Sequence, residues 1–106
     1  MIRVLYSFQI KAGMEKDFSD AWARVTRTIK TTAKGARGSM LTRDMSDRQQ
    51  YVAVARWETL QDFQRFHNVG LAGSEAAKAM NATLDMPVAM QIVEEVNDLT
   101  VYDEKK

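Results

Sequence analysis

Two side chains of this sequence could move a proton in a reaction near neutral pH. His67 is the single histidine, and imidazole is the side chain whose ordinary pKa lies nearest neutrality. It is therefore the candidate general base, which would deprotonate a phenol-like substrate. Tyr6 brings a phenol of its own that could orient a substrate oxygen or relay a proton. Both also have a structural interpretation: His67 as a surface or capping residue, and Tyr6 as a core residue with its hydroxyl at the rim.

Three large apolar side chains could form the walls of a pocket around such a substrate. Trp22, Phe66 and Met80 fall on the apolar stripes of three separate expected helices. Aromatic and thioether side chains suit an apolar cavity, and Met86 and Met90 are soft gap fillers of the same kind. Ordinary core packing explains the same residues, so both interpretations stay open.

The composition excludes several other kinds of chemistry. The chain has no cysteine, which excludes disulfides, thiolate metal sites and cysteine nucleophiles. One histidine cannot form an all-histidine metal cage within a chain. No glycine-rich phosphate loop, nucleophile elbow or paired-carboxylate spacing is present. The sequence therefore predicts no metal and no cofactor.

Charge and hydropathy limit the partners. Fifteen Lys and Arg residues against fourteen Asp and Glu residues leave a net charge of +1, without a long run of either sign. This balance does not indicate a nucleic-acid-binding surface. No apolar run approaches the roughly 18 residues of a membrane span, and the first residues resemble a strand rather than a signal peptide. We expect a cytoplasmic protein without a nucleic-acid or membrane partner.

The periodicity of the chain predicts the elements that would position these residues. With 106 residues, 45% of them apolar, the chain has the size and composition of one globular domain. Residues 2–10 alternate in polarity, as a strand does. Lys30 belongs to the polar side of the long helix that follows. The apolar stripe of that helix consists of Met14, Phe18, Trp22, Val25 and Ile29.

The middle of the chain predicts a hairpin and two short helices. Residues 38–44 and 49–57 are the two strands of the hairpin. Thr59 followed by Asp62 resembles a capping box, which would open the first short helix. Ser74 would cap the second.

The end of the chain predicts a last strand and a tail. The second short helix would extend to Leu84, and Pro87, the single proline, would end it and open a strand at 88–96. We therefore expect one α+β domain at 1–98, followed by a C-terminal edge strand and charged tail at 99–106.

The order β-α-β-β-α-α-β predicts a ferredoxin-like α+β sandwich, because helices that return between strands bury their apolar stripes on one face of the sheet. The opposite face is too apolar to remain in water as one patch. A second copy of the chain would cover it, which predicts a barrel-like homodimer with residues 99–102 crossing onto the partner. The apolar residues expected on that open face are Leu5, Val52, Val54 and either Met90 or Ile92.

Two arginines, Arg43 and Arg56, fall within the expected strands. An arginine enclosed between two sheets needs a carboxylate partner. Asp44, Glu94 or Glu95 could supply it. We therefore expect these arginines to form ion pairs between subunits rather than to bind substrate.

Three segments of the chain resemble the antibiotic biosynthesis monooxygenase family: 11–15 (Lys-Ala-Gly-Met-Glu), 38–44 (Gly-Ser-Met-Leu-Thr-Arg-Asp) and 56–63 (Arg-Trp-Glu-Thr-Leu-Gln-Asp-Phe). The resemblance extends over residues 2 to about 96 and implies a dimeric α+β barrel. It also implies that Trp57 plugs the corner between strand and helix. Relatives in this family include cofactor-independent oxygenases of polycyclic aromatic ketones and phenols, haem-degrading enzymes, quinol oxygenases and members without an assigned reaction.

The haem-degrading branch of that family can be compared with this sequence residue by residue. Its asparagine on the first strand, tryptophan in the second helix and later histidine correspond here to Tyr6, Phe66 and Ala76. None of the three matches, and His67 projects about 100° away from Phe66 on a helix. The resemblance therefore disfavours haem degradation.

Two classes of function remain from the sequence. The first is a cofactor-independent monooxygenase that oxidises a small aromatic substrate, with His67 as the base, Tyr6 as its hydrogen-bonding partner and Trp22, Phe66 and Met80 as walls. The alternative is a non-catalytic dimeric module that binds a small hydrophobic molecule or a partner protein. A haem-binding or haem-degrading monooxygenase comes third.

Overall fold

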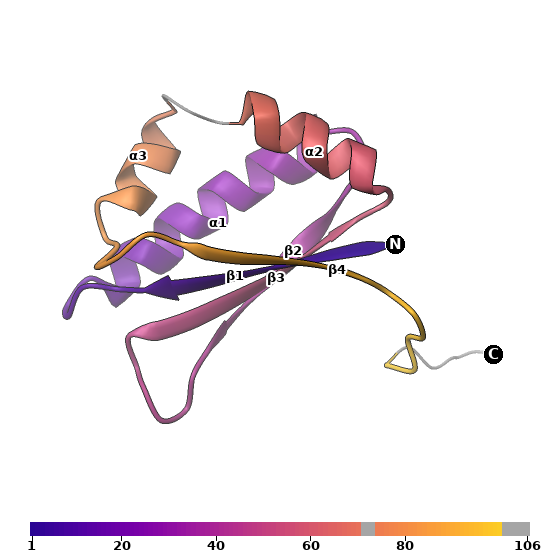
Figure 1. The fold of residues 1–106 in the computed structure, drawn as a ribbon. Helices are drawn as coiled ribbons and strands as arrows, with labels where there is room; N and C mark the ends of the chain where they lie inside the picture. Colours follow the sequence, from indigo (N-terminus) through magenta and orange to yellow (C-terminus); the bar gives the residue numbers. More distant parts are fainter. Residues whose placement is uncertain (71–73, 101–106) are drawn as a thin grey trace.

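The computed structural model describes residues 1–70 and 74–100. Four strands form one sheet in the order β2-β3-β1-β4, with each neighbouring pair antiparallel. The three helices of the described residues lie on one side of this sheet (Figure 1), which confirms the predicted α+β sandwich. None of these helices is long and apolar enough to cross a membrane. The elements are β1 (Ile2–Gln9), α1 (Glu15–Thr32), β2 (Ala36–Arg43), β3 (Gln50–Trp57), α2 (Leu60–Val69), α3 (Glu75–Asn81) and β4 (Ala89–Glu94).

The two central strands carry the core on the face that the helices cover, which we call the helix-side face. Burial alternates along β3 because successive side chains of a strand point to opposite faces. Val4 and Phe8 of β1 are buried on the helix-side face, as is Tyr51 of β3. Phe18 of α1 packs between Phe8 and Tyr51, with ring centroids 4.9 and 5.1 Å away. This packing fixes α1 across the sheet.

Glycine and hydroxyl residues mark the helix ends, as the sequence predicts. Gly35 follows α1 with a φ of +82°, in the left-handed region that glycine enters without strain. Thr59 Oγ1 accepts the backbone N–H of Asp62 at 3.1 Å and begins α2. Ser74 Oγ accepts the backbone N–H of Ala77 at 3.0 Å and begins α3.

Three details of the prediction were wrong. The capping box of α2 lacks its reciprocal half, because the Asp62 carboxylate accepts a hydrogen bond from Arg65 Nη1 at 3.1 Å instead. The helix α3 ends before Leu84, which forms a β-bridge with Ile10. The last strand is shorter than the predicted 88–96.

The register of β4 corrects the expected composition of the open face. Met90 lies opposite Tyr6, and Ile92 lies opposite Val4. Directly paired residues of an antiparallel sheet point to the same face. Met90 and Ile92 therefore belong to the helix-side face, at an edge where they remain 41% and 42% exposed.

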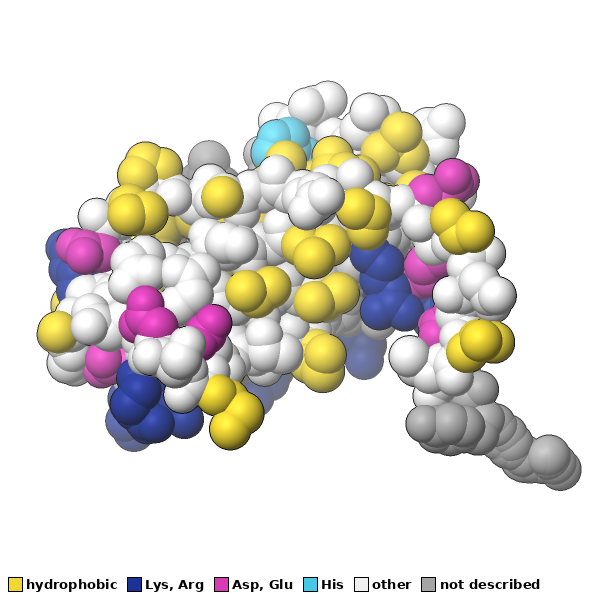
Figure 2. All heavy atoms as spheres, turned by 60° about the horizontal axis from the view of Figure 1, so that its bottom comes forward, with side chains coloured by type: hydrophobic (Ala, Val, Ile, Leu, Met, Phe, Trp, Pro, Cys, Tyr) yellow, Lys and Arg dark blue, Asp and Glu magenta, His cyan; other side chains and the backbone are white. Residues whose placement is uncertain are grey.

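The open face carries Leu5, Val52 and Val54, as predicted, and all three are half-buried. Met40 lies opposite Val54 and is 60% exposed. Figure 2 shows apolar side chains gathered on this side of the molecule, next to basic ones. This surface is therefore the apolar patch for which the sequence predicts a second copy of the chain.

The segment after β4 leaves the body of the sheet (Figure 1). Leu99 and Thr100 are not part of a strand, and residues 101–106 lie outside the described residues. The edge strand at the C-terminus, and its crossing onto a partner, stay predictions.

Candidate functional site

A cavity of about 410 Å³ lies between the helix-side face of the sheet and the helices. Its lining comes from β1, β2, β3, α1, α2 and α3, and is mainly apolar. This volume falls in the lower part of the roughly 300–1,000 Å³ range of small-molecule pockets. The cavity brings together all five residues proposed from the sequence: Tyr6, Trp22, Phe66, His67 and Met80.

Small residues on the sheet make room for this cavity. On the helix-side face of β3, two small side chains, Ala53 and Ala55, lie between the large aromatic side chains of Tyr51 and Trp57. Ser39 of β2 lies opposite Ala55 and adds another small side chain. Ala55 and Ser39 both line the cavity, together with Ala36 and Gly38 of β2.

Tyr6 contributes a neutral phenol to the cavity. It lies on the helix-side face of β1, with its ring 6.2 Å from that of Phe8. Its hydroxyl has no hydrogen-bond partner among the described residues, and burial raises the pKa of this phenol. Tyr6 therefore remains a hydrogen-bond donor at neutral pH, available to a ligand oxygen.

His67 stands at the outer side of the cavity. It follows Phe66 on α2, its side chain is exposed, and its ring stacks on that of Phe63 with centroids 5.5 Å apart. Within the described part of the chain, no hydrogen bond fixes either ring nitrogen. His67 thus lines the cavity and is open to solvent.

The proposed wall residues come from different helices. Trp22 is half-buried on α1, and Met80 of α3 packs against the core cluster around Phe8. Phe66 stacks on Trp57 with ring centroids 5.4 Å apart. Trp57 is 2% exposed and fills the corner between β3 and α2, as the resemblance implies.

Met86 and Met90 are not part of the cavity lining. They are 57% and 41% exposed: Met86 precedes β4, and Met90 belongs to β4, which is an edge strand of the sheet. Their chemical type suits a cavity, but the register of β4, which decides where Met90 lies, cannot be derived from local sequence patterns.

Sequence reasoning missed a group of polar lining residues: Thr26 and Lys30 of α1 and Ser39 of β2. The sequence pattern predicts Lys30 on the polar side of that helix. A signal was present, because Trp22, Thr26 and Lys30 follow one another at intervals of four and therefore share one side of a helix.

The family model of the antibiotic biosynthesis monooxygenases matches residues 1–82. The chain belongs to this family. It is 32% identical over 84 residues to the uncharacterized protein YczJ of Bacillus subtilis, and the match covers 79% of this chain and 83% of the relative.

Two solved structures, one assigned to the antibiotic biosynthesis monooxygenase family and one of a cofactor-independent oxygenase, share the fold. A protein from Bordetella bronchiseptica assigned to this family has a TM-score of 0.78 at 24% identity, over 91% of this chain and 97% of that one. SnoaB, a cofactor-independent oxygenase from Streptomyces nogalater, has a TM-score of 0.75 at 19% identity, over 93% and 96% of the two chains. At these identities the likeness establishes the fold alone.

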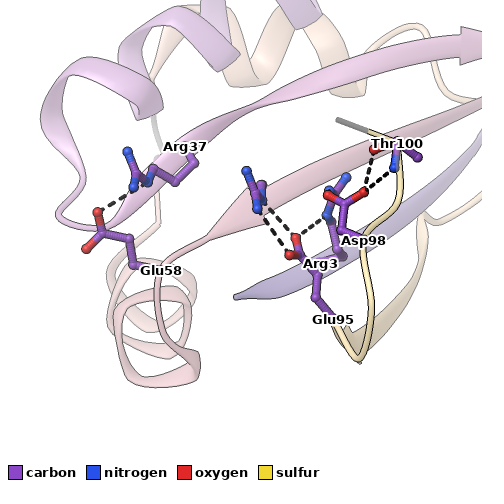
Figure 3. Close-up of polar contacts among 7 residues, drawn as sticks. Arg3, Arg37, Glu58, Glu95, Asp98 and Thr100 are labelled. Atoms are coloured by element: carbon purple, nitrogen blue, oxygen red, sulfur yellow. Dashed lines mark hydrogen bonds and ion pairs between the residues drawn. The ribbon is translucent and has the colours of Figure 1, made fainter. Parts of the chain in front are cut away.

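In this member of the antibiotic biosynthesis monooxygenase family, Arg56 on the open face forms an ion pair with a carboxylate of the same chain. Arg56 donates through Nε and Nη2 to the two carboxylate oxygens of Glu95, at 2.8 and 3.1 Å. Arg3 bonds the same carboxylate and reaches Asp98 at 3.3 Å (Figure 3). The expected ion pair between subunits is thus found between β3 and the segment after β4 of one chain, whereas Arg43 is exposed at the end of β2.

The two arginines act directly on the Glu95 carboxyl. Hydrogen bonds from Arg56 first and Arg3 second lower the pKa of Glu95 from its ordinary 4.5 to about 2. The carboxylate therefore stays charged over the neutral and mildly acidic range, and it ties Glu95, directly after β4, to the arginines of β1 and β3.

Proposed function

We propose that this protein is a cofactor-independent monooxygenase that oxidises a small phenol, quinol or anthrone-like substrate. The observation that carries the proposal is the cavity itself: an apolar space that contains an unpartnered phenol, Tyr6, and has an imidazole, His67, at its outer side. Membership of the antibiotic biosynthesis monooxygenase family supports the reaction class. An aromatic substrate fits the aromatic and thioether walls of the cavity.

For an anthrone-like substrate, the electrons that reduce dioxygen come from the substrate itself, so the oxidation needs no metal or flavin. His67 removes a proton from the ring CH₂ group, and the resulting carbanion gives one electron to dioxygen. The substrate radical and superoxide combine to form a C–O bond, and protonation yields a hydroperoxide. Removal of the second C–H proton breaks the O–O bond and releases water, so that CH₂ and O₂ become C=O and H₂O.

The remaining lining residues would orient the substrate and exclude water from the cavity. Tyr6 would donate a hydrogen bond to the substrate oxygen, on which negative charge collects after deprotonation. Its raised pKa keeps the phenol protonated for that task. Trp22, Phe66 and Met80 would hold the ring system and keep water away from the carbanion.

The active form in this proposal is a homodimer that covers the open face. Leu5, Val52 and Val54 of two sheets would pack against each other, as expected for an apolar patch that water does not solvate well. The Arg56–Glu95 pair would lie beside this interface with its charges already balanced within each subunit.

The proposal is tested by oxygen uptake with anthrone-like and quinol compounds. Removal of a general base costs about 10²–10⁴ in rate. We expect His67→Ala to lower oxygen consumption by at least about a hundredfold at an unchanged melting temperature, since its side chain is exposed. If the wild-type protein binds these compounds without oxygen uptake, the proposed monooxygenase activity is wrong and a non-catalytic binding module is favoured.

That second candidate is a non-catalytic dimeric module for a small hydrophobic ligand. The observation in its favour is the imidazole of His67, which stacks on Phe63 with no described hydrogen bond to orient it. A binding module of this kind predicts that the wild-type protein and His67→Ala bind the ligand with equal affinity.

A haem titration separates both candidates from a haem-degrading enzyme. Tyr6, Phe66 and Ala76 occupy the positions that the resemblance gives for the haem-degrading residues, and the side chains of Phe66 and Ala76 have no ligating atom. We expect no saturable Soret shift. Binding of one haem per chain that disappears in His67→Ala would move this protein to the haem-degrading branch.

A further inference from the structure

One row of α1 that faces the cavity becomes polar toward the C-terminal end of the helix. Trp22, Thr26 and Lys30 are separated by four residues each, so that their side chains lie along one side of the helix. All three line the cavity. A row that served packing alone would continue with apolar residues, whereas this one ends in a hydroxyl and an ammonium group.

The end of the Lys30 side chain lies beside an irregular part of β2. The Lys30 side chain passes Gly38 of β2, and its Nζ is 3.9 Å from the place where a Cβ atom on Gly38 would stand. Gly38 has a φ of +93°, and the β2–β3 register shifts between Ala36 and Ser39. This irregularity is a β-bulge, and bulges redirect neighbouring side chains.

The bulge brings Ser39 to the same corner of the cavity. Ser39 lies opposite Ala55, which is buried on the helix-side face, so Ser39 points toward α1. Thr26, Lys30 and Ser39 thus form one polar corner, drawn from α1 and β2. Among the described residues, none of these three side chains has a hydrogen bond or an ion pair with another side chain.

The charge of the cavity lining is one-sided. The described lining contains no aspartate and no glutamate. Arg56 is also part of the lining, but its side chain belongs to the open face of the sheet, where its guanidinium is bound to Glu95. Lys30, whose side chain is exposed at the rim of the cavity, is therefore the basic lining residue without a described ion pair, and it remains available to an anionic ligand.

We propose that Lys30, with the hydroxyls of Thr26 and Ser39, recognises a carboxylate substituent on the aromatic substrate. The inference rests on the proposed function in one respect, because it places an aromatic compound in this cavity. It adds the substrate class: aromatic acids are preferred over their neutral analogues. The ammonium and two hydroxyls supply donors for both carboxylate oxygens.

Calorimetric titration with 2-naphthoate and its methyl ester tests this assignment without requiring turnover. Charge-assisted hydrogen bonds are stronger than neutral ones, so we expect the wild-type protein to bind the acid about tenfold more tightly than the ester. Lys30→Met should bind the two compounds equally and Lys30→Arg should keep the preference. The matched control is Lys34→Met, which changes an exposed lysine outside the cavity lining and should also keep it.

The outcomes separate this inference from the proposed function. Equal binding of acid and ester by the wild-type protein, or a preference that survives in Lys30→Met, would overturn the role of Lys30 and leave the aromatic cavity standing. Failure of both compounds to bind would overturn the cavity as an aromatic site as well. As a measurement that needs no variant, added salt should weaken binding of 2-naphthoate and leave binding of the ester unchanged.

Discussion

β1 supplies Tyr6 to one face of the sheet and Arg3 to the other, and the two faces use their polar groups in opposite ways. On the helix-side face the polar groups are few and unpartnered: the Tyr6 hydroxyl and the Lys30 ammonium line an apolar cavity. On the open face the charges are paired, with Arg3 and Arg56 sharing the Glu95 carboxylate. A cavity with unused donors is suited to a ligand, whereas a surface with balanced charges is suited to close contact with another protein surface.

The comparison also separates two kinds of aromatic residue on the helix-side face. Trp57 is 2% exposed and packs against Phe63 and Phe66, with ring centroids 5.8 and 5.4 Å away. Trp22 is half-buried and lines the cavity beside Met80. The first is a structural plug and the second is a wall, although both line the same space.

The largest effect is expected from removal of that plug. Replacing a buried Trp by Ala costs about 3–5 kcal/mol, a large part of the stability of a domain of this size. We expect Trp57→Ala to lose that much free energy of unfolding in urea titrations. The matched variant Trp22→Ala should lose less and should fold, but bind 2-naphthoate weakly. Similar losses of stability in the two variants would remove the distinction between plug and wall.

The next effect concerns the unpartnered phenol. If Tyr6 donates to the charge that develops on the substrate, Tyr6→Phe should lower kcat by about a hundredfold, as removal of one such donor does elsewhere. The melting temperature should stay the same, because the hydroxyl has no described partner to lose. Tyr51→Phe is the matched control: Tyr51 lies on the same face, 5% exposed and outside the lining of this cavity, and should leave kcat unchanged. An unchanged kcat in Tyr6→Phe would assign Tyr6 to the core.

On the open face, a charge in the centre of the apolar patch should separate the proposed dimer. Val54 is half-buried between β1 and β2, opposite Leu5 and Met40. Val54→Lys would place an unpaired ammonium between two sheets, so sedimentation should give a monomer where the wild-type protein gives a dimer. Gln64→Lys, on the exposed side of α2, should stay dimeric. A wild-type monomer at high concentration would contradict the proposed use of this face.

The sequence was sufficient for the element order because local patterns carry it. The alternation around Tyr6, the apolar stripe through Trp22 and the caps at Thr59 and Ser74 each depend on a few neighbouring residues. Four of the five proposed site residues came together for the same reason: Tyr6, Trp22, Phe66 and Met80 lie on the apolar sides of their elements, and these sides meet between the layers. His67 lies at the edge of the apolar side of α2 and lines the cavity from its exposed rim.

What the sequence did not show depends on register and on contacts between distant segments. A shift of one residue exchanges the two faces of a strand, so the face of Met90 could not be known before β4 was paired with β1. Glu95 meets Arg56 across 39 residues of sequence, and nothing local indicates that pairing. Lys30 was missed because helical periodicity separates polar from apolar sides, and a polar residue at the edge of a cavity resembles an ordinary surface residue.

The smallest effect should come from the charge pairing on the open face, and it should depend on pH. The Glu95 pKa is about 2 in the folded protein and near 4.5 when unpaired, so the folded state binds this proton less tightly than the unfolded chain does. The stabilisation is therefore complete above about pH 4.5 and is lost as the pH falls toward about 2. Glu95→Gln should lower the urea midpoint near neutral pH and flatten its fall over that window. Glu94→Gln, an exposed neighbour outside the described ion pairs, should keep the wild-type profile. A Glu95→Gln profile parallel to the wild-type one would mean that the two arginines leave Glu95 unperturbed, and the open face would then lack the charge balance that distinguishes it from the cavity.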